Sequence, residues 1–135
     1  MRFLLDSHIL LWFLDDPDMQ LSSEEQSAIG APDHEVVVSV VTLWELAIKE
    51  ATGKLRLGRP IRPQLIANDL TELPIRGSHT DCYRRLAPLH RDPFDRMLVA
   101  QAIDEDLILI TRDAVLGEYP VQILGRQATR CVGPQ

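Results

Sequence analysis

Cysteine is scarce in this chain: Cys82 and Cys131 are the only two among 135 residues, and they form no CxxC pair. A disulfide framework is therefore not expected, and a reducing cytoplasm is the simpler compartment. Long apolar runs are also missing, because none approaches the ~20 residues that cross a bilayer. The start meets a charge at Asp6 after three apolar residues. We therefore predict neither a membrane span nor a signal peptide.

Several motifs of known chemistry are absent. The sequence contains no GxxxxGK[ST], GxGxxG or GxSxG pattern, which argues against a P-loop, a dinucleotide fold and a serine hydrolase. The histidines at 8, 34, 79 and 90 lack metal-ligand spacing, so a zinc site is not expected. Positive charge is also short, since the formal net charge is −6. Residues 1–40 carry −7 of this and residues 41–135 carry +1, so net charge does not exclude a nucleic-acid partner.

The remaining pattern alternates apolar strands with amphipathic helices. We predict strands at 2–6, 35–39, 73–75, 107–111 and 121–124. Helices are predicted at 8–14 (capped by Ser7), 22–29 (a Ser22 capping box), 39–53 (capped by Ser39 or Thr42), 61–70, 78–86 and 92–105. The long strands are apolar throughout, as in sheets covered on both faces. This indicates one α/β domain over 1–135, a three-layer sandwich with a mainly parallel central sheet flanked by helices. Trp12 and Trp44 are assigned to its core, and the segment after about 125 has no usable pattern.

Four acidic residues occupy positions where carboxylates usually cost stability. Asp6 and Asp113 end apolar strands, Glu45 lies within a helix, and Asp95 is the third residue of another. Functional crevices in open α/β sheets lie beyond the carboxyl ends of the strands, so the fold gives these side chains a common destination. Carboxylates about 4 Å apart repel by about 4 kcal/mol at an effective dielectric of 20. A divalent cation, Mg²⁺ or Mn²⁺, would relieve this repulsion and suit phosphodiester hydrolysis.

Each acid also has a simpler explanation. Asp6 could be only a helix cap and Asp113 a turn residue, while Asp95 could complement its helix dipole. Glu45 could pair with Lys49 one turn later. Asp92 is assigned to capping alone and is left outside the site. Basic residues at 49, 54, 56, 59, 91, 96 and 112 could form a rim that contacts a nucleic-acid backbone; we single out Arg112, Lys49, Arg91 and Arg96, although solvated surface charges explain them equally well.

Four segments carry a resemblance to a known family. They are residues 4–12 (LLDSHILLW), 39–49 (SVVTLWELAIK), 90–102 (HRDPFDRMLVAQA) and 109–113 (LITRD). Together they resemble the PIN-domain family, and most of all the VapC-like toxin ribonucleases of type II toxin–antitoxin modules. Two small departures are Ser7, where the family often has Thr, and Leu89, where relatives often have a second His. Neither removes an acid.

The resemblance implies a Mg²⁺ or Mn²⁺ centre formed by Asp6, Glu45, Asp95 and Asp113, which would be both metal ligands and catalytic residues. It implies cleavage of structured RNA, often tRNA or ribosomal RNA, and a homodimer held by a small antitoxin protein whose tail blocks the site. Our main hypothesis is thus a cytoplasmic, metal-dependent endoribonuclease. The alternatives are a metal-dependent DNA nuclease or phosphatase, and a PIN-like module that binds RNA or protein without cleavage.

Overall fold

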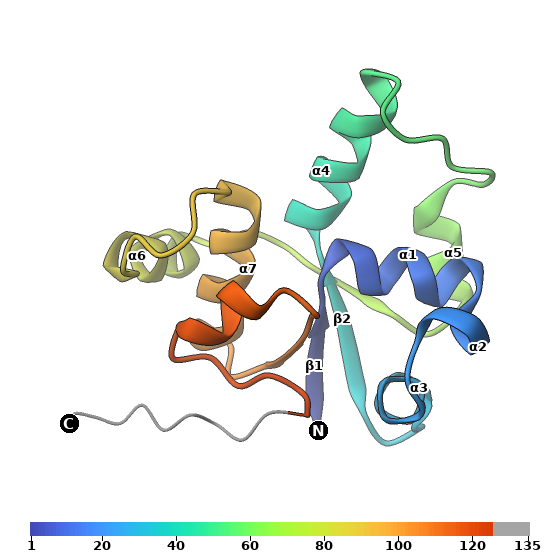
Figure 1. Cartoon of the computed structure of the whole chain (residues 1–135), viewed down its shortest axis with the longest axis horizontal. Coiled ribbons are helices and arrows are strands. Elements are labelled where there is room, and N and C mark those ends of the chain that lie inside the picture. Colours follow the sequence, from blue (N-terminus) through green and yellow to red (C-terminus); the bar gives the residue numbers. More distant parts are fainter. Residues whose placement is uncertain (126–135) are drawn as a thin grey trace.

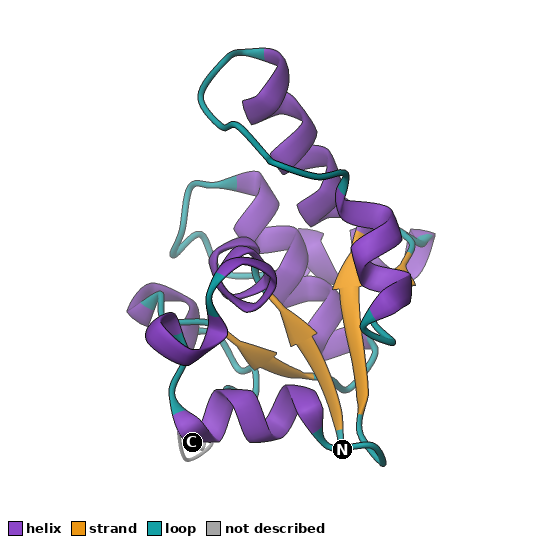
Figure 2. Cartoon of the chain, turned by 90° about the vertical axis from the view of Figure 1, so that its right-hand side faces the viewer, coloured by secondary structure: helices purple, strands orange, loops and turns teal. Residues whose placement is uncertain are grey.

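A parallel sheet forms the centre of the computed structural model, which describes residues 1–125. Within this range the sheet has four strands: β1 (Arg2–Leu5), β2 (Glu35–Ser39), β3 (Thr71–Leu73) and β4 (Ile108–Ile110), in the order β3-β2-β1-β4. Figure 2 shows the strand arrows pointing the same way between layers of helices. The chain crosses the sheet in one direction and then returns to the other side of β1. The switch point of the topology therefore lies between β1 and β4.

The two faces of the sheet bury alternating residues of the same strands. Phe3 and Leu5 pack with residues of α1, α3 and α5, whereas Leu4 packs with residues of α7. Continuous apolar runs such as Val36–Val38 are needed because both faces are covered. This is the predicted three-layer α/β sandwich. No helix among the described residues is long and apolar enough to span a membrane.

The helices begin at capping residues that the sequence makes recognisable. Ser22 forms a capping box with Glu25, Ser39 caps α4, and Asp92 caps α7 with Pro93 at its first position. The bounds are α1 Ser7–Asp15, α2 Pro17–Gln20, α3 Ser23–Gly30, α4 Val40–Ala51, α5 Ile61–Ala67, α6 Gly77–Arg85, α7 Pro93–Asp104 and a 3₁₀ turn Ala114–Glu118. Figure 1 shows α4 continuing from the end of β2 and projecting beyond the sheet. This projection creates one wall above the strand ends.

Some predicted elements need correction. The cap of α1 is Asp6, not Ser7, because the Asp6 carboxylate accepts a hydrogen bond from the Ile9 amide. The strand predicted at 73–75 lies at 71–73 instead, ending before Pro74, which has no amide hydrogen for the ladder. The strand predicted at 121–124 is reduced to a single bridge between Leu109 and Ile123. Helix α2 and the 3₁₀ turn were not predicted.

Trp44 is the clearest error in the predicted core. Its side chain is 57% exposed, and its ring meets the ring of Phe94 edge-on, with centroids 5.0 Å apart. The same helix exposes 40% of Ile48. Helical periodicity marks these positions as apolar, but α4 projects beyond the sheet, so within residues 1–125 both side chains stay partly exposed. Trp12, by contrast, is partly buried and packs against the core cluster that contains Phe3 and Leu5.

Candidate metal centre

Asp6 follows the central strand β1 and is held in one orientation. Its side chain is buried, with only 7% of the residue exposed. One carboxylate oxygen accepts from the Ile9 amide at 2.9 Å, and the other accepts from the Thr111 hydroxyl at 2.5 Å. Burial raises the pKa of Asp6, and the nearby Asp113 charge adds to this, while the bonds from Thr111 and Ile9 oppose it. The residue is thus a helix cap and also part of an acidic cluster.

Asp113 comes from the segment after β4, the neighbour of β1. Its Oδ1 accepts from the Val115 amide at 3.0 Å and so caps the 3₁₀ turn. The Thr111 hydroxyl also accepts a bond from the Asp113 amide at 3.1 Å, besides donating to Asp6. One hydroxyl therefore ties Asp6 to the backbone of Asp113. Thr111 was not predicted to belong to the site. Its place at the end of an apolar strand, two residues before Asp113, was the available signal.

Asp95 lies in the first turn of α7 and has the most perturbed carboxyl group. Its pKa is raised to about 6, first by burial and then by the charges of Asp92, Glu45 and Asp113. The nearby His90 acts in the opposite direction. An Asp at a helix N-terminus normally gains stability from the helix dipole. Here burial and like charge outweigh that gain, so the dipole explanation alone does not account for this residue.

Glu45 belongs to α4 and is mostly buried, with 13% of its side chain exposed. The Nζ of Lys49, one turn later, lies 3.6 Å from its Oε2. This is the ion pair that the i,i+4 spacing suggested, but its N–O distance is long. The charge of Glu45 also helps to raise the pKa of Asp95. The mutual influence of neighbouring acids runs from Asp6 to Asp113, from Asp113 to Asp95 and from Asp95 to Glu45. The four predicted acids therefore form a chain of electrostatic neighbours, and their assembly into one metal centre stays a prediction.

His90 stands among these acids, and the sequence did not reveal it. Its Nε2 lies 3.2 Å from Asp113 Oδ2 and 3.4 Å from Asp95 Oδ2. Its Nδ1 accepts a hydrogen bond from the Asp92 amide at 3.1 Å. A neutral ring that accepts at Nδ1 carries its hydrogen on Nε2. In this arrangement His90 is a donor that steadies two carboxylates, rather than a metal ligand. Its position two residues before the cap of α7 was the available signal.

The donor set fits a hard divalent cation. Each of the four carboxylates acts electrostatically on at least one of the others, and within residues 1–125 their ion pairs are those with His90 and Lys49, so negative charge is in excess. A raised Asp95 pKa is the expected response of crowded carboxylates without a cation. Oxygen ligands suit Mg²⁺ or Mn²⁺ better than softer metals. The residues that would hold such an ion are Asp6, Glu45, Asp95 and Asp113.

The four basic residues singled out from the sequence have different surroundings. Lys49 and Arg91 line a cleft beside the acids. Arg96 donates to the Ala87 carbonyl at 3.0 Å and lies 4.8 Å over the Tyr83 ring. Arg112 donates to both Glu25 carboxylate oxygens and to the Gln20 carbonyl, and it stacks on Trp12. Arg96 and Arg112 therefore have substantial roles within the fold, and their contact with RNA stays a prediction.

Fold and site together define a class: parallel α/β proteins with an acidic centre at the carboxyl ends of the strands. Within that class, this chain belongs to the PIN domain family, whose family model matches residues 3–121. Its sequence is similar to the protein named ribonuclease VapC22 of Mycobacterium tuberculosis, with 29% identity over 119 residues, covering 86% of this chain and 90% of the relative.

Solved structures share the fold at lower identity. The VapBC2 complex of Rickettsia felis, bound to a DNA fragment from its promoter, aligns with a TM-score of 0.70 and 17% identity, covering 91% of this chain and 96% of that one. VapBC-1 of nontypeable Haemophilus influenzae aligns at 0.61 with 20% identity, covering 87% and 91%. A toxin–antitoxin complex of Klebsiella pneumoniae aligns at 0.54 with 18% identity, covering 82% and 86%. At these identities the likeness concerns the fold.

Proposed function

We propose that this protein is a metal-dependent endoribonuclease that acts as the toxin of a toxin–antitoxin pair. The observation that carries the proposal is the uncompensated acidic cluster at the switch point between β1 and β4, where Asp95 has a pKa of about 6. Membership of the PIN domain family and the similarity to a ribonuclease support it. Structured RNA, such as tRNA or ribosomal RNA, is the substrate we propose.

The reaction is hydrolysis of a phosphodiester bond. A water oxygen bonds to phosphorus, a water proton passes to a base, and a ribose oxygen leaves with a proton. When bound, Mg²⁺ or Mn²⁺ polarises a phosphate oxygen and makes a water molecule more acidic. Asp6 and Asp113 are held by the Ile9 and Val115 amides and act as fixed ligands. The Asp95 carboxylate accepts no backbone amide bond within residues 1–125, and we assign it to orient the water and accept its proton.

The proposed partners follow from the same resemblance. Three similar folds were solved as VapBC or toxin–antitoxin complexes, which supports a small antitoxin protein as a partner of this chain. We also propose a homodimer in the cytoplasm. Cys82 is buried and forms no disulfide within residues 1–125, which suits a reducing compartment. Cys131 lies outside the described residues, as does the segment after 125.

The nuclease proposal is tested by incubating RNA and DNA of one sequence with the protein in Mg²⁺, in Mn²⁺ and in EDTA. We expect RNA cleavage with either metal and none in EDTA. Asp6→Asn and Asp95→Asn should abolish cleavage and keep the far-UV circular dichroism of the wild type. Asp81→Asn, which changes an exposed acid on α6, is the matched control. Equal cleavage by the two site variants and the wild type would remove the acidic centre from the mechanism.

The toxin proposal needs a cellular test. Expression of the wild-type chain alone should arrest growth of a bacterial host, and co-expression of the neighbouring small gene should relieve the arrest. Asp6→Asn, expressed to the same level, should be harmless. Normal growth with an active protein at that level would contradict the toxin role while leaving the nuclease activity in place.

A further inference from the structure

A cleft of about 630 Å³ opens beside the acidic centre. One wall is the last half of α4 and the segment that follows it, including Ile48 and Lys54, and the other is the segment that opens α7, including Arg91 and Phe94. Glu45 and His90 belong to the cleft and to the acidic centre alike. A molecule seated in this cleft would therefore lie directly next to the bond cleaved at the acids.

Apolar side chains line the cleft although they face solvent. Ile48 is 40% exposed and Phe94 is partly buried on the opposite wall. Trp44 meets Phe94 edge-on and leaves most of its own ring exposed, so aromatic surface continues beyond the cleft. Exposed aromatic and aliphatic groups beside a charged centre mark a binding surface rather than a solvated face. Flat aromatic ligands, including every nucleobase, gain from stacking on such groups.

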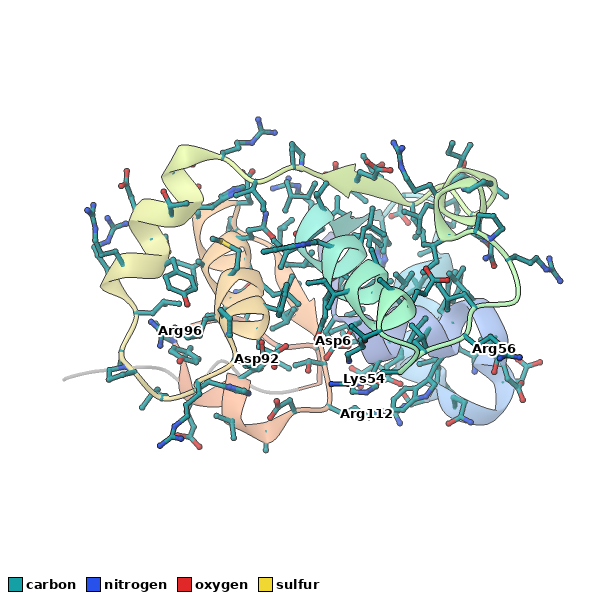
Figure 3. The ribbon with its side chains drawn as sticks, turned by 90° about the horizontal axis from the view of Figure 1, so that it is seen from above. Asp6, Lys54, Arg56, Asp92, Arg96 and Arg112 are labelled. Carbon is teal, nitrogen blue, oxygen red and sulfur yellow. The ribbon has the colours of Figure 1, made fainter. Side chains whose placement is uncertain are left out.

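Positive charge surrounds the same cleft. Lys49, Lys54 and Arg91 line it, and neither Lys54 nor Arg91 forms a salt bridge within residues 1–125. Figure 3 looks onto this end of the molecule and labels Lys54 near its middle, with Asp92 on one side and Arg56 on the other. Arg56, two residues after Lys54, lines a different hollow with Trp12 and Leu55. The pairing of cations with apolar walls therefore suits a ligand that is itself flat and anionic.

We propose that the cleft between α4 and the start of α7 holds one unpaired nucleobase of the RNA, with Lys54 and Arg91 contacting the phosphates on either side of it. The inference rests on the proposed nuclease function and narrows its substrate to RNA loops, bulges and single strands. A base inside a continuous double helix is stacked on both faces, so it cannot enter the cleft and stack on protein side chains. The volume is within the usual range of about 300–1,000 Å³ for ligand sites.

The experiment measures binding of a fluorescein-labelled oligouridylate by anisotropy, in an Asp6→Asn background that prevents cleavage. Ile48→Ala combined with Phe94→Leu should weaken binding at least about fivefold, because base stacking is lost while Leu keeps the packing. Lys54→Ala should also weaken binding and lower the slope of log affinity against log salt by about 0.7, the value for one phosphate on a single strand. Arg56→Ala is the matched control and should leave both quantities unchanged.

A second probe tests whether a base fills the cleft. Replacing one uridine of a trinucleotide by an abasic ribose should weaken binding to the parent protein and have no further effect on the Ile48→Ala, Phe94→Leu variant. The affinity for a long RNA duplex should be the same for that variant and for the parent protein. Identical oligouridylate binding by the parent and both cleft variants, with unchanged thermal unfolding, overturns the inference.

Parallel assays separate this inference from the proposed function. If the wild-type protein cleaves RNA in Mn²⁺ and the cleft variants bind RNA as tightly as the parent, only the proposed base site is wrong. Failure of the wild type to cleave or bind any RNA removes both. If the cleft variants bind oligouridylate normally but lose a co-purified antitoxin, the cleft is a protein-docking surface and the inference is wrong.

Discussion

Two clusters in this protein combine one histidine with two carboxylates, and they behave in opposite ways. His79 lies 2.7 Å from Glu105 and 3.7 Å from Asp104. His90 lies 3.2 Å from Asp113 and 3.4 Å from Asp95. Both sets have the residue types and the compactness of a metal site. Composition and distance alone therefore do not separate them.

The His79 cluster is internally satisfied. Its imidazole is completely buried, with Nδ1 accepting from the Arg76 amide at 3.0 Å and Nε2 bonded to Glu105. Arg76 also lies 3.5 Å from Glu105, so the carboxylate meets a permanent positive charge. Gln101 approaches the same ring and accepts from the Ser39 hydroxyl at 2.5 Å, which links α7 to the cap of α4. Such a network specifies how the helices pack.

The His90 cluster carries more negative charge than the nearby basic groups balance. His90 lies beside Asp113 and Asp95, Lys49 lies 3.6 Å from Glu45, and the charges of Asp92, Glu45 and Asp113 add to burial in raising the Asp95 pKa to about 6. Uncompensated charge costs stability, and proteins keep it where a ligand restores the balance. The lesson is that charge balance, more than residue type, distinguishes a functional cluster from a structural one. Four experiments test this comparison.

The largest contrast is expected in catalysis. Asp113→Asn should lower RNA cleavage by two to three orders of magnitude, roughly the effect of losing a charge that acts on the transition state. Glu105→Gln, which makes the equivalent change beside His79, should change the rate of folded protein by less than about twofold. Rates are measured in Mn²⁺ at equal concentrations of folded protein. Similar losses in both variants would abolish the distinction between the clusters.

Stability should show the reverse order. His79→Ala should lower the free energy of unfolding by about 3 kcal/mol, since it opens a cavity and removes the partner of the Arg76 amide and of the Glu105 carboxylate. His90→Ala should cost less than about 1 kcal/mol in the metal-free protein, because 20% of its side chain is exposed. Urea denaturation of both variants gives the two values. A costlier His90→Ala would mean that His90 is chiefly structural.

The pH dependence of stability should identify Asp95. Its folded pKa of about 6 exceeds its ordinary value of 3.8, so the folded state binds the proton more tightly than the unfolded state. The favourable contribution is complete below pH 3.8 and is lost as pH rises through 6. Asp95→Asn should therefore stabilise the metal-free protein by about 2 kcal/mol at pH 7.5, after allowance for partial exposure.

The same variant should change the response to metal. Mn²⁺ should raise the melting temperature of the wild type at pH 7.5 and have little effect on Asp95→Asn. Differential scanning fluorimetry at pH 4.5 and pH 7.5, with and without Mn²⁺, gives all the comparisons. A destabilised Asp95→Asn protein at pH 7.5 would contradict the repulsion on which this prediction depends.

The smallest effect is expected at Thr111, whose hydroxyl joins Asp6 to the Asp113 backbone. Thr111→Val keeps the shape of the side chain and removes both hydrogen bonds. Mn²⁺ affinity, measured by calorimetry, should fall about tenfold, as when a group that orients a metal ligand is lost. Thr71→Val, at an exposed position of β3, is the control. Unchanged affinity would show that the buried environment of Asp6 orients it sufficiently without Thr111.

Local patterns predicted much of the fold. Apolar runs located β1, β2 and β4, and capping residues such as Ser22 and Asp92 located helix starts. The wrong predictions of secondary structure and burial fall where contacts with distant residues decide the result. The segment at 121–124 looks like a strand, but β4 offers it a single bridging residue, Leu109. Trp44 follows the apolar periodicity of α4, but its helix projects beyond the sheet and Trp44 stays 57% exposed.

The sequence by itself determined the alternation of strands and helices and the positions of the four acids along them, because periodicity, capping and charge are local properties. Only the tertiary structure decided that Asp6, Asp113, Asp95 and Glu45 act on one another's charge, that His90 lies beside Asp113 and Asp95, and that His79 forms a satisfied network elsewhere. The reason is physical: a carboxylate's pKa and its partners depend on groups up to about a hundred residues away, which meet only when the sheet forms.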